Sequence, residues 1–130
     1  NTDSIVAIGG IYKDEGSIEQ ALYCFKLAAE ADNLDGIIGY AGLLEETGGD
    51  IEELMQMYRK AAGLGSADAA EALGRIYEDK NSPEYSPDIA VFWYRQAVSL
   101  GKQSAETEAA RLEKDTEKDI DVEIEYDDDI

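Results

Sequence analysis

Three stretches of this 130-residue chain repeat one pattern of small and aromatic residues, and this repeat limits the possible folds more than any other feature. The first glycines of the pattern, Gly9, Gly42 and Gly74, are 33 and 32 residues apart. A fourth, incomplete copy begins near Ser104. Each full copy continues with the same three positions: Ala21, Phe25 and Ala28; Leu54, Tyr58 and Ala61; Ala90, Tyr94 and Ala97. A period of this length is typical of stacked supersecondary units that bury their apolar faces against their neighbours.

The spacing of apolar residues within a copy is helical. Ile5, Ile8, Gly9 and Tyr12 fall at i, i+3, i+4 and i+7, which is the stripe of one buried helix face. Residues 1–112 contain no strand pattern. The sequence therefore predicts an all-α fold of about three and a half helix-turn-helix repeats. We expect helices over about 3–14, 17–31, 35–47, 50–63, 67–80, 87–100 and 104–118.

Capping residues stand where three of these helices should begin. Ser17 with Gln20, and Asp50 with Glu53, have the spacing of a capping box. The pair Ser86-Pro87 places a capping serine before a proline at the first helical position.

The repeat glycines predict close helix crossings. A glycine inside a helix costs about 1 kcal/mol relative to alanine, a cost that a close crossing makes tolerable. The alanines of the second helices would face these glycines. Aromatic side chains would then fill the larger gaps of the core: Tyr12, Phe25, Tyr58, Tyr77, Trp93 and Tyr94.

The order of these residues resembles the tetratricopeptide pattern, which the first copy follows without a gap. The third copy looks more like the Sel-one-like subclass of that family, because a longer loop over residues 81–87 separates its two helices. The residues that carry this second resemblance are Ala72, Leu73, Gly74, Arg75, Ile76, Tyr77, Ala90, Trp93, Tyr94, Ala97, Leu100, Gly101 and Ala105. The middle copy repeats part of the pattern with Tyr58, Arg59, Lys60, Ala61, Ala62, Gly65 and Ala69.

The resemblance implies a right-handed α-α superhelix, a solenoid of helix pairs. We expect one repeat domain over residues 1–118, with units at about 4–34, 35–66, 67–102 and a partial unit at 103–118. Two positions depart from the family pattern. Glu45 stands where a tyrosine is expected, and Asp32 stands where the later copies have Gly65 and Gly101.

The family implies that the concave face, made by the first helix of each unit, binds a peptide or a protein element. By analogy this face comprises Val6, Gly10, Lys13, Gly39, Leu43, Glu46, Glu71, Arg75, Glu78, Thr107 and Arg111. We expect Gly10 and Gly39 to leave the floor of the groove open for a ligand backbone. We expect Lys13, Arg75 and Arg111 to grip carboxylates, and the alternative is that these are solvated helix positions.

Charge and composition exclude several classes of function. The chain carries 30 acidic and 11 basic side chains, a formal net charge of −19, which argues against nucleic-acid partners and anionic lipid surfaces. No apolar run approaches the ~20 residues that span a bilayer, so no membrane insertion is expected. Histidine is absent, which excludes histidine-dependent triads and metal sites. The single cysteine, Cys24, cannot close an intramolecular disulfide.

No pattern of catalytic or cofactor-binding residues remains. The segment from Ala31 to Gly42 faintly resembles a calcium loop but lacks both end ligands. Gly48-Gly49-Asp50 lacks the lysine of a phosphate-binding loop. Cys24, beside Phe25, is expected to act as a small buried hydrophobe. We therefore predict no enzyme activity, no metal and no cofactor.

The C-terminal segment has a different character. Residues 113–130 contain ten acids and two lysines, a net charge of −8. Four apolar residues alternate with acids at a period of two, which predicts an extended, acidic tail over residues 119–130: Ile120, Val122, Ile124 and Tyr126. The alternatives are a disordered tail, self-association through this apolar edge, and an acidic mimic that occupies a basic cleft of a partner.

The sequence thus predicts a non-catalytic protein-interaction module or adaptor with a protein or peptide partner. The alternative is a small acidic immunity-type inhibitor that neutralises a basic toxin or enzyme, since −19 charges attract a cationic partner. A third hypothesis, an enzyme with clustered carboxylates and a divalent metal, is weaker. The compartment stays open, and the cytoplasm is slightly favoured over the periplasm or secretion.

Overall fold

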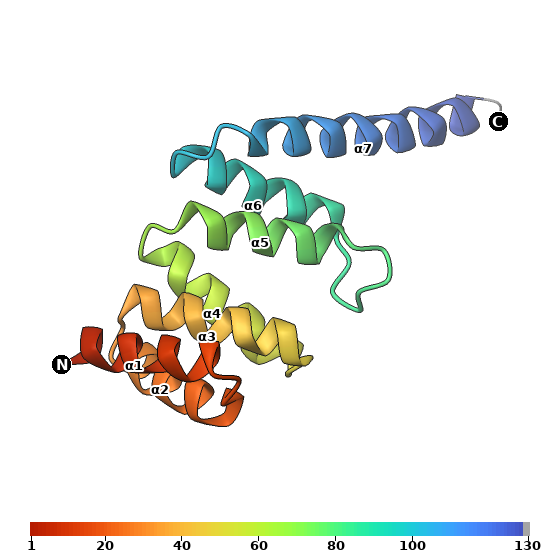
Figure 1. The fold of residues 1–130 in the computed structure, drawn as a ribbon. Helices are drawn as coiled ribbons and strands as arrows, with labels where there is room; N and C mark the ends of the chain where they lie inside the picture. The colour runs from red at the N-terminus through yellow and green to blue at the C-terminus, as the bar shows by residue number, and fades with distance from the viewer. Residues whose placement is uncertain (129–130) are drawn as a thin grey trace. The chain divides into compact units, whose positions relative to one another are not determined.

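The computed structural model describes the backbone of residues 1–128 and the side chains of residues 1–116 (Figure 1). In this part the chain forms helices and no strand, which confirms the all-α fold. The first six helices begin and end within two residues of the expected positions. The helices are α1 (Thr2–Asp14), α2 (Ile18–Glu30), α3 (Leu34–Thr47), α4 (Ile51–Gly63), α5 (Ala67–Glu78), α6 (Pro87–Ser99) and α7 (Ala105–Asp128).

The chain divides into two compact units, Asn1–Gly65 and Ser66–Ile130, here called unit 1 and unit 2. In unit 1, α2 packs against both α1 and α3, and α4 packs against α3. In unit 2, α6 packs against both α5 and α7 (Figure 1). Consecutive helices therefore supply most of the packing within each unit. The single domain expected over residues 1–118 stays a prediction.

The core of unit 1 is built around the Phe25 ring, which is 6% exposed. A Cβ built on Gly9 of α1 would lie 3.1 Å from Phe25 Cε1, and one on Gly39 of α3 would lie 2.7 Å from the ring. A Cβ on Gly36 would meet Ala28 Cβ at 2.5 Å. A Cβ would therefore overlap α2 at Gly36 and Gly39 and would be tight at Gly9, because α2 approaches both neighbouring helices closely. Burial of such a phenylalanine contributes about 1.5–3 kcal/mol.

The core of unit 2 repeats the contact between a glycine and an aromatic ring. A Cβ on Gly74 of α5 would lie 2.8 Å from the Tyr94 ring of α6, and Tyr94 is 1% exposed. The close crossings expected at Gly9 and Gly74 are confirmed, but the Phe25 and Tyr94 rings, and not the alanines that the sequence predicted, face these glycines. The start of α7 completes this core with Ala105, Ala109 and Leu112, which are all buried.

The α3–α4 pair lacks the expected crossing at its repeat glycine. No described side chain or neighbouring backbone lies within 4 Å of a Cβ built on Gly42, so that prediction is wrong. Instead, the Tyr58 hydroxyl donates a hydrogen bond to Glu45 Oε2 at 2.5 Å. Glu45 thus joins α3 to α4 from the position at which the family pattern has a tyrosine.

Asp32 departs from the glycine pattern without changing the turn. Its φ is +61°, in the left-handed region that Gly65 and Gly101 also occupy, with φ of +102° and +113°. Among residues other than glycine, aspartate is one of those that adopt this conformation most readily. The turn between α2 and α3 therefore keeps its backbone geometry.

The predicted helix caps are confirmed only in part. The Asp50 side chain accepts from the Glu52 backbone N–H at 3.2 Å, and Pro87 lies in the first turn of α6. Ser17 and Ser86 stand at the N-cap positions of α2 and α6 as predicted, but neither side chain makes a capping hydrogen bond. At Ser17 the backbone ψ of 72° lies outside the extended conformation usual for an N-cap.

The aromatic residues expected in the core are not all buried. Phe25, Tyr77 and Tyr94 are buried, whereas Tyr12, Tyr58 and Trp93 are only partly buried. The Trp93 ring packs edge to face against Phe92 with the ring centroids 5.2 Å apart, and Phe92 is exposed. The sequence-based placement of Trp93 in the core is therefore wrong. On a helix, Trp93 and Tyr94 point about 100° apart, so only one of them can face the Gly74 crossing.

The extended tail is also corrected, because α7 continues as a helix to Asp128. The alternating residues include two pairs at i, i+4, Ile120 with Ile124 and Val122 with Tyr126, so the pattern also fits a helix. Once the buried start of α7 is formed, each further residue adds a hydrogen bond without a new nucleation cost. Residues 129 and 130 lie outside the described part.

Candidate protein-binding groove

Unit 2 contains a groove of about 770 Å³ between the end of α5, the loop that follows it and α7. Charged, polar and apolar side chains line it together. The lining residues are Arg75, Glu78, Asp79, Lys80, Asn81, Tyr85, Pro87, Arg111, Leu112 and Asp115.

The loop wall of this groove is held by its own hydrogen bonds. The Asn81 N–H donates to Asp79 Oδ1 at 2.9 Å, and the Tyr85 N–H donates to the Ser82 carbonyl at 3.1 Å. The Ser86 N–H donates to the carbonyl of Tyr77 at 2.8 Å, which ties the loop back to α5. The longer loop between α5 and α6 is therefore held in place by these hydrogen bonds and forms one wall of the groove.

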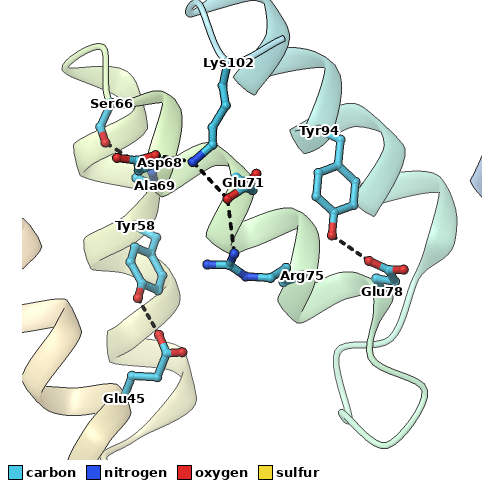
Figure 2. A network of polar contacts seen from close by, with 10 residues as sticks. All are labelled: Glu45, Tyr58, Ser66, Asp68, Ala69, Glu71, Arg75, Glu78, Tyr94 and Lys102. Atoms are coloured by element: carbon cyan, nitrogen blue, oxygen red, sulfur yellow. Dashed lines mark hydrogen bonds and ion pairs between the residues drawn. The ribbon is translucent and has the colours of Figure 1, made fainter. Parts of the chain in front are cut away.

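Glu78 joins all three helices of unit 2. The buried Tyr94 hydroxyl of α6 donates to Glu78 Oε2 at 2.6 Å (Figure 2), and burial and this hydrogen bond both raise the tyrosine pKa. The Arg111 guanidinium of α7 donates to Glu78 Oε1 and also to Glu108 Oε2, the latter at 2.7 Å. Hydrogen bonds to Glu108 and Glu78 raise the pKa of Arg111, which stays charged. This network fixes α5, α6 and α7 against one another beside the groove.

A second network links α5 to the turn before α7. Lys102 Nζ lies 2.5 Å from Asp68 Oδ1 and 3.1 Å from Glu71 Oε1 (Figure 2). The same Glu71 oxygen accepts from Arg75 Nη1 at 3.1 Å. Hydrogen bonds to Asp68 and Glu71 raise the pKa of Lys102. Arg75 therefore enters the groove with its charge balanced by a neighbouring carboxylate.

The structure brings together several residues that the sequence assigned to the concave face. In unit 2, Arg75, Glu78 and Arg111 line the groove, and Glu71 pairs with Arg75. Thr107 is exposed on α7 outside the groove lining. In unit 1, Lys13 Nζ of α1 lies 3.8 Å from Glu46 Oε1 of α3. Val6 and Gly10 are partly exposed, and a Cβ on Gly10 would meet no described atom within 4 Å.

Two residues of the predicted face do not serve as expected. Leu43 is 0% exposed, so it belongs to the core and offers no surface to a ligand. Gly39 does not open a groove floor, because the Phe25 ring fills the space beside it. Both predictions failed for the same reason. The family pattern indicates which positions share a face of α3, but it does not indicate how deeply that face is buried. The predicted tail contacts Ile120, Val122, Ile124 and Tyr126 lie outside the described side chains.

Sequence reasoning missed the groove residues that the loop contributes. Tyr85, Asn81 and Lys80 line the groove, yet the longer loop entered the prediction only as a mark of the subclass. The available signal was the loop length itself, since a long connection between two helices must cover some part of their surface. On α7, Asp115 follows Arg111 by four positions and Leu112 by three, so it shares a side of the helix with each of them.

Among the side chains that the structure describes, no group of three acidic or cysteine residues is placed to hold a metal ion. No helix in the described part of the chain is long and apolar enough to span a bilayer. Cys24 is a free, partly buried thiol on α2.

Comparison with known proteins supports the fold. No family model matches the chain, and no curated protein matches it. Among solved structures, a Sel1 repeat protein from Oxalobacter formigenes is similar, with 25% sequence identity and a TM-score of 0.66. The match covers 84% of this chain and 47% of that protein, so the chain spans about half of its length. The similarity confirms the resemblance to Sel1-like helical repeats.

Proposed function

We propose that this chain is a non-catalytic protein-interaction module whose unit 2 groove binds a peptide segment of a protein partner. The groove itself carries the proposal. Its volume is about 770 Å³, and two helices and a hydrogen-bonded loop form its walls. A pre-formed groove lowers the entropic cost of binding because its own side chains are already held in place.

The side chains of the groove favour a segment that is not strongly acidic. Arg75 pairs with Glu71, and Arg111 pairs with Glu78 and Glu108. An incoming carboxylate would have to displace these internal partners, which reduces its net gain. Tyr85 offers exposed apolar surface, Leu112 is a buried apolar residue of the lining, and Asp79 and Asp115 add two acids. We propose a ligand that combines an apolar side chain with a neutral or basic one.

The acidic inhibitor remains a second candidate, favoured by one further observation. At least six of the eleven basic side chains form ion pairs with carboxylates of this chain: Lys13, Lys60, Arg75, Arg95, Lys102 and Arg111. Because these basic side chains are already paired, the electrostatic potential at the surface is dominated by the excess of carboxylates. A field of this kind accelerates association with one basic partner, and the effect falls steeply with salt.

The proposal is tested by selecting peptides from a displayed random library on the immobilised full chain and titrating them by calorimetry. The variant Tyr85→Glu changes an exposed groove residue and should weaken binding at least about tenfold. The matched control Gln96→Glu adds the same charge at an exposed position of α6 outside the groove lining. It should leave the affinity unchanged.

Two results would decide against groove binding. Selected peptides that bind Tyr85→Glu and the parent chain equally would place the site elsewhere. Binding that disappears at high salt in both variants, for basic peptides of unrelated sequence, would favour the acidic inhibitor.

A further inference from the structure

Unit 1 carries a second candidate surface, which goes beyond the groove of unit 2. We call it the α1–α2 apolar face, made of Ile8, Ile11, Tyr12, Tyr23, Cys24 and Leu27. Four of these large side chains are well exposed: Ile8 46%, Ile11 56%, Tyr23 66% and Leu27 39%. A cavity of about 450 Å³ lies within the face, lined by Ile8, Tyr12, Glu19, Gln20, Tyr23 and Cys24.

Comparing the first two copies of the repeat shows which kind of element faces the equivalent surface in the second copy. Residues 33 positions apart are equivalent in the first two copies, as Ala21, Phe25 and Ala28 are to Leu54, Tyr58 and Ala61. The four α2 residues of the cavity correspond in this register to Glu52, Glu53, Gln56 and Met57 of α4. All four of these α4 residues line a cavity of about 360 Å³, and its opposite wall is α2, with Lys26, Ala29 and Glu30. In the second copy, the equivalent surface therefore faces a helix.

The first helix of each repeat copy shows the same difference in exposure. Ile8 is equivalent to Ala41 and Leu73 in the later copies, and both of those are 0% exposed. The same repeat position is thus part of the core in two copies and is nearly half exposed in α1. A contiguous exposed apolar patch is a common mark of an interaction site.

We propose that the α1–α2 apolar face binds one amphipathic helix of a partner protein, at the place where α2 faces the equivalent surface of α4 across a cavity. The charge of the chain argues for a partner with basic residues beside its apolar stripe. Glu19, Glu30 and one basic residue, Lys26, lie at the margins of the face, and the chain as a whole carries −19 charges. Two copies of this chain would repel each other, so a second copy is disfavoured as the occupant.

One position shows how the docked helix must differ from α2. In the second copy, Lys60 Nζ donates to the Ala29 carbonyl at 3.0 Å and lies 2.7 Å from Asp32, at the C-terminal end of α2. The equivalent residue in the first copy is Leu27. In the second copy, Lys60 binds the C-terminal end of α2. Because Leu27 takes the place of Lys60 in the first copy, the docked helix should place an apolar side chain against Leu27.

The test uses the full chain and a fluorescent synthetic peptide with the α2 sequence from Ser17 to Ala31, carrying Glu19→Lys, Glu30→Lys and Cys24→Ser. This peptide keeps the apolar face of α2 and adds basic flanks. Fluorescence anisotropy should show saturable binding, and Tyr23→Glu in the full chain should weaken it at least about tenfold. The matched control is Gln56→Glu, the equivalent exposed position of α4, and it should bind like the parent chain.

Each other outcome overturns the proposal. Absence of saturable binding would show that the face accepts no helix of this chemistry. Equal binding by the parent chain and Tyr23→Glu would place the peptide elsewhere. Sedimentation velocity showing a dimer that Tyr23→Glu dissolves would make a second copy the occupant. Far-ultraviolet circular dichroism of the two variants, each changed at an exposed residue, verifies that both are folded.

Discussion

The α1–α2 and α3–α4 pairs of unit 1 carry the same sequence pattern, yet they pack differently. In the first pair, Gly9 meets the Phe25 ring, and a Cβ there would lie 3.1 Å from it. In the second pair, Gly42 meets nothing within 4 Å, and the Tyr58 hydroxyl reaches Glu45 at 2.5 Å. The same sequence pattern therefore gives an apolar crossing between α1 and α2 and a hydrogen-bonded contact between α3 and α4.

This difference shows what the repeat pattern specifies. It determines which residues form helices and where the turns lie. The contact between two helices depends on a few further side chains. Glu45 is such a residue, because a carboxylate at this position gives the tyrosine hydroxyl an acceptor. The α5–α6 pair combines both solutions: the Tyr94 ring meets Gly74, and its hydroxyl donates to Glu78.

The largest expected effect separates the two aromatic residues. Phe25→Ala should reduce the free energy of unfolding by about 3–5 kcal/mol, because it empties the centre of unit 1. Tyr58→Ala should cost clearly less, since Tyr58 is only partly buried. Urea denaturation followed by circular dichroism measures both. Equal losses would show that the α3–α4 pair depends on its aromatic residue as much as the α1–α2 pair does.

The next effect concerns two glycines of one helix. Gly39→Ala should destabilise the chain by about 1–3 kcal/mol, because its Cβ would overlap the buried Phe25 ring. Gly42→Ala should stabilise it by up to about 1 kcal/mol, because alanine favours the helix and meets no neighbour. Thermal melts of the two variants give the signs directly. Destabilisation by Gly42→Ala would mean that α3 and α4 do approach closely there.

A third prediction uses the other polar link between α3 and α4. The Tyr40 hydroxyl donates to Glu53, and burial followed by this hydrogen bond raises the pKa of Tyr40 to about 12. An unfolded tyrosine titrates near pH 10, so between pH 10 and about 12 the folded chain binds more protons than the unfolded one. The stability due to this group is complete below pH 10 and is lost as the pH rises.

The free energy of unfolding should therefore fall across this range, and less steeply in Tyr40→Phe than in the parent chain. Urea titrations at a series of pH values measure the two slopes. Tyr94, whose pKa is also raised, contributes in both proteins, so only the difference between the slopes reports on Tyr40. Identical slopes would contradict the link between Tyr40 and Glu53.

The smallest effect is expected from the ion pairs of unit 2. Lys102→Ala removes contacts to Asp68 and Glu71 and should lower the melting temperature slightly. The difference from the parent chain should vanish in concentrated salt, since the screening length falls to about 3 Å at 1 M. A difference that persists in salt would indicate that the Lys102 stem contributes by packing.

The sequence predicted the helices, their order and two of the three glycine crossings, because periodicity and small residues report these features directly. It could not predict the burial of Leu43 or the packing of Gly39 against Phe25, because both depend on how deeply α3 is buried in the folded unit. It placed both Trp93 and Tyr94 in the core, although two adjacent residues of a helix point about 100° apart and only Tyr94 faces Gly74. The groove wall at Tyr85 follows from the fold of the loop, for which the sequence has no periodic signal.

The most direct test of the proposed function is amide chemical-shift mapping of the isotope-labelled full chain with a peptide selected on it. The account predicts that the largest shifts occur at the groove, around Asn81, Tyr85 and Leu112, with saturation at the calorimetric affinity. Shifts confined to helices other than α5 and α7, or spread evenly over the acidic surface, would contradict a peptide-binding groove in unit 2.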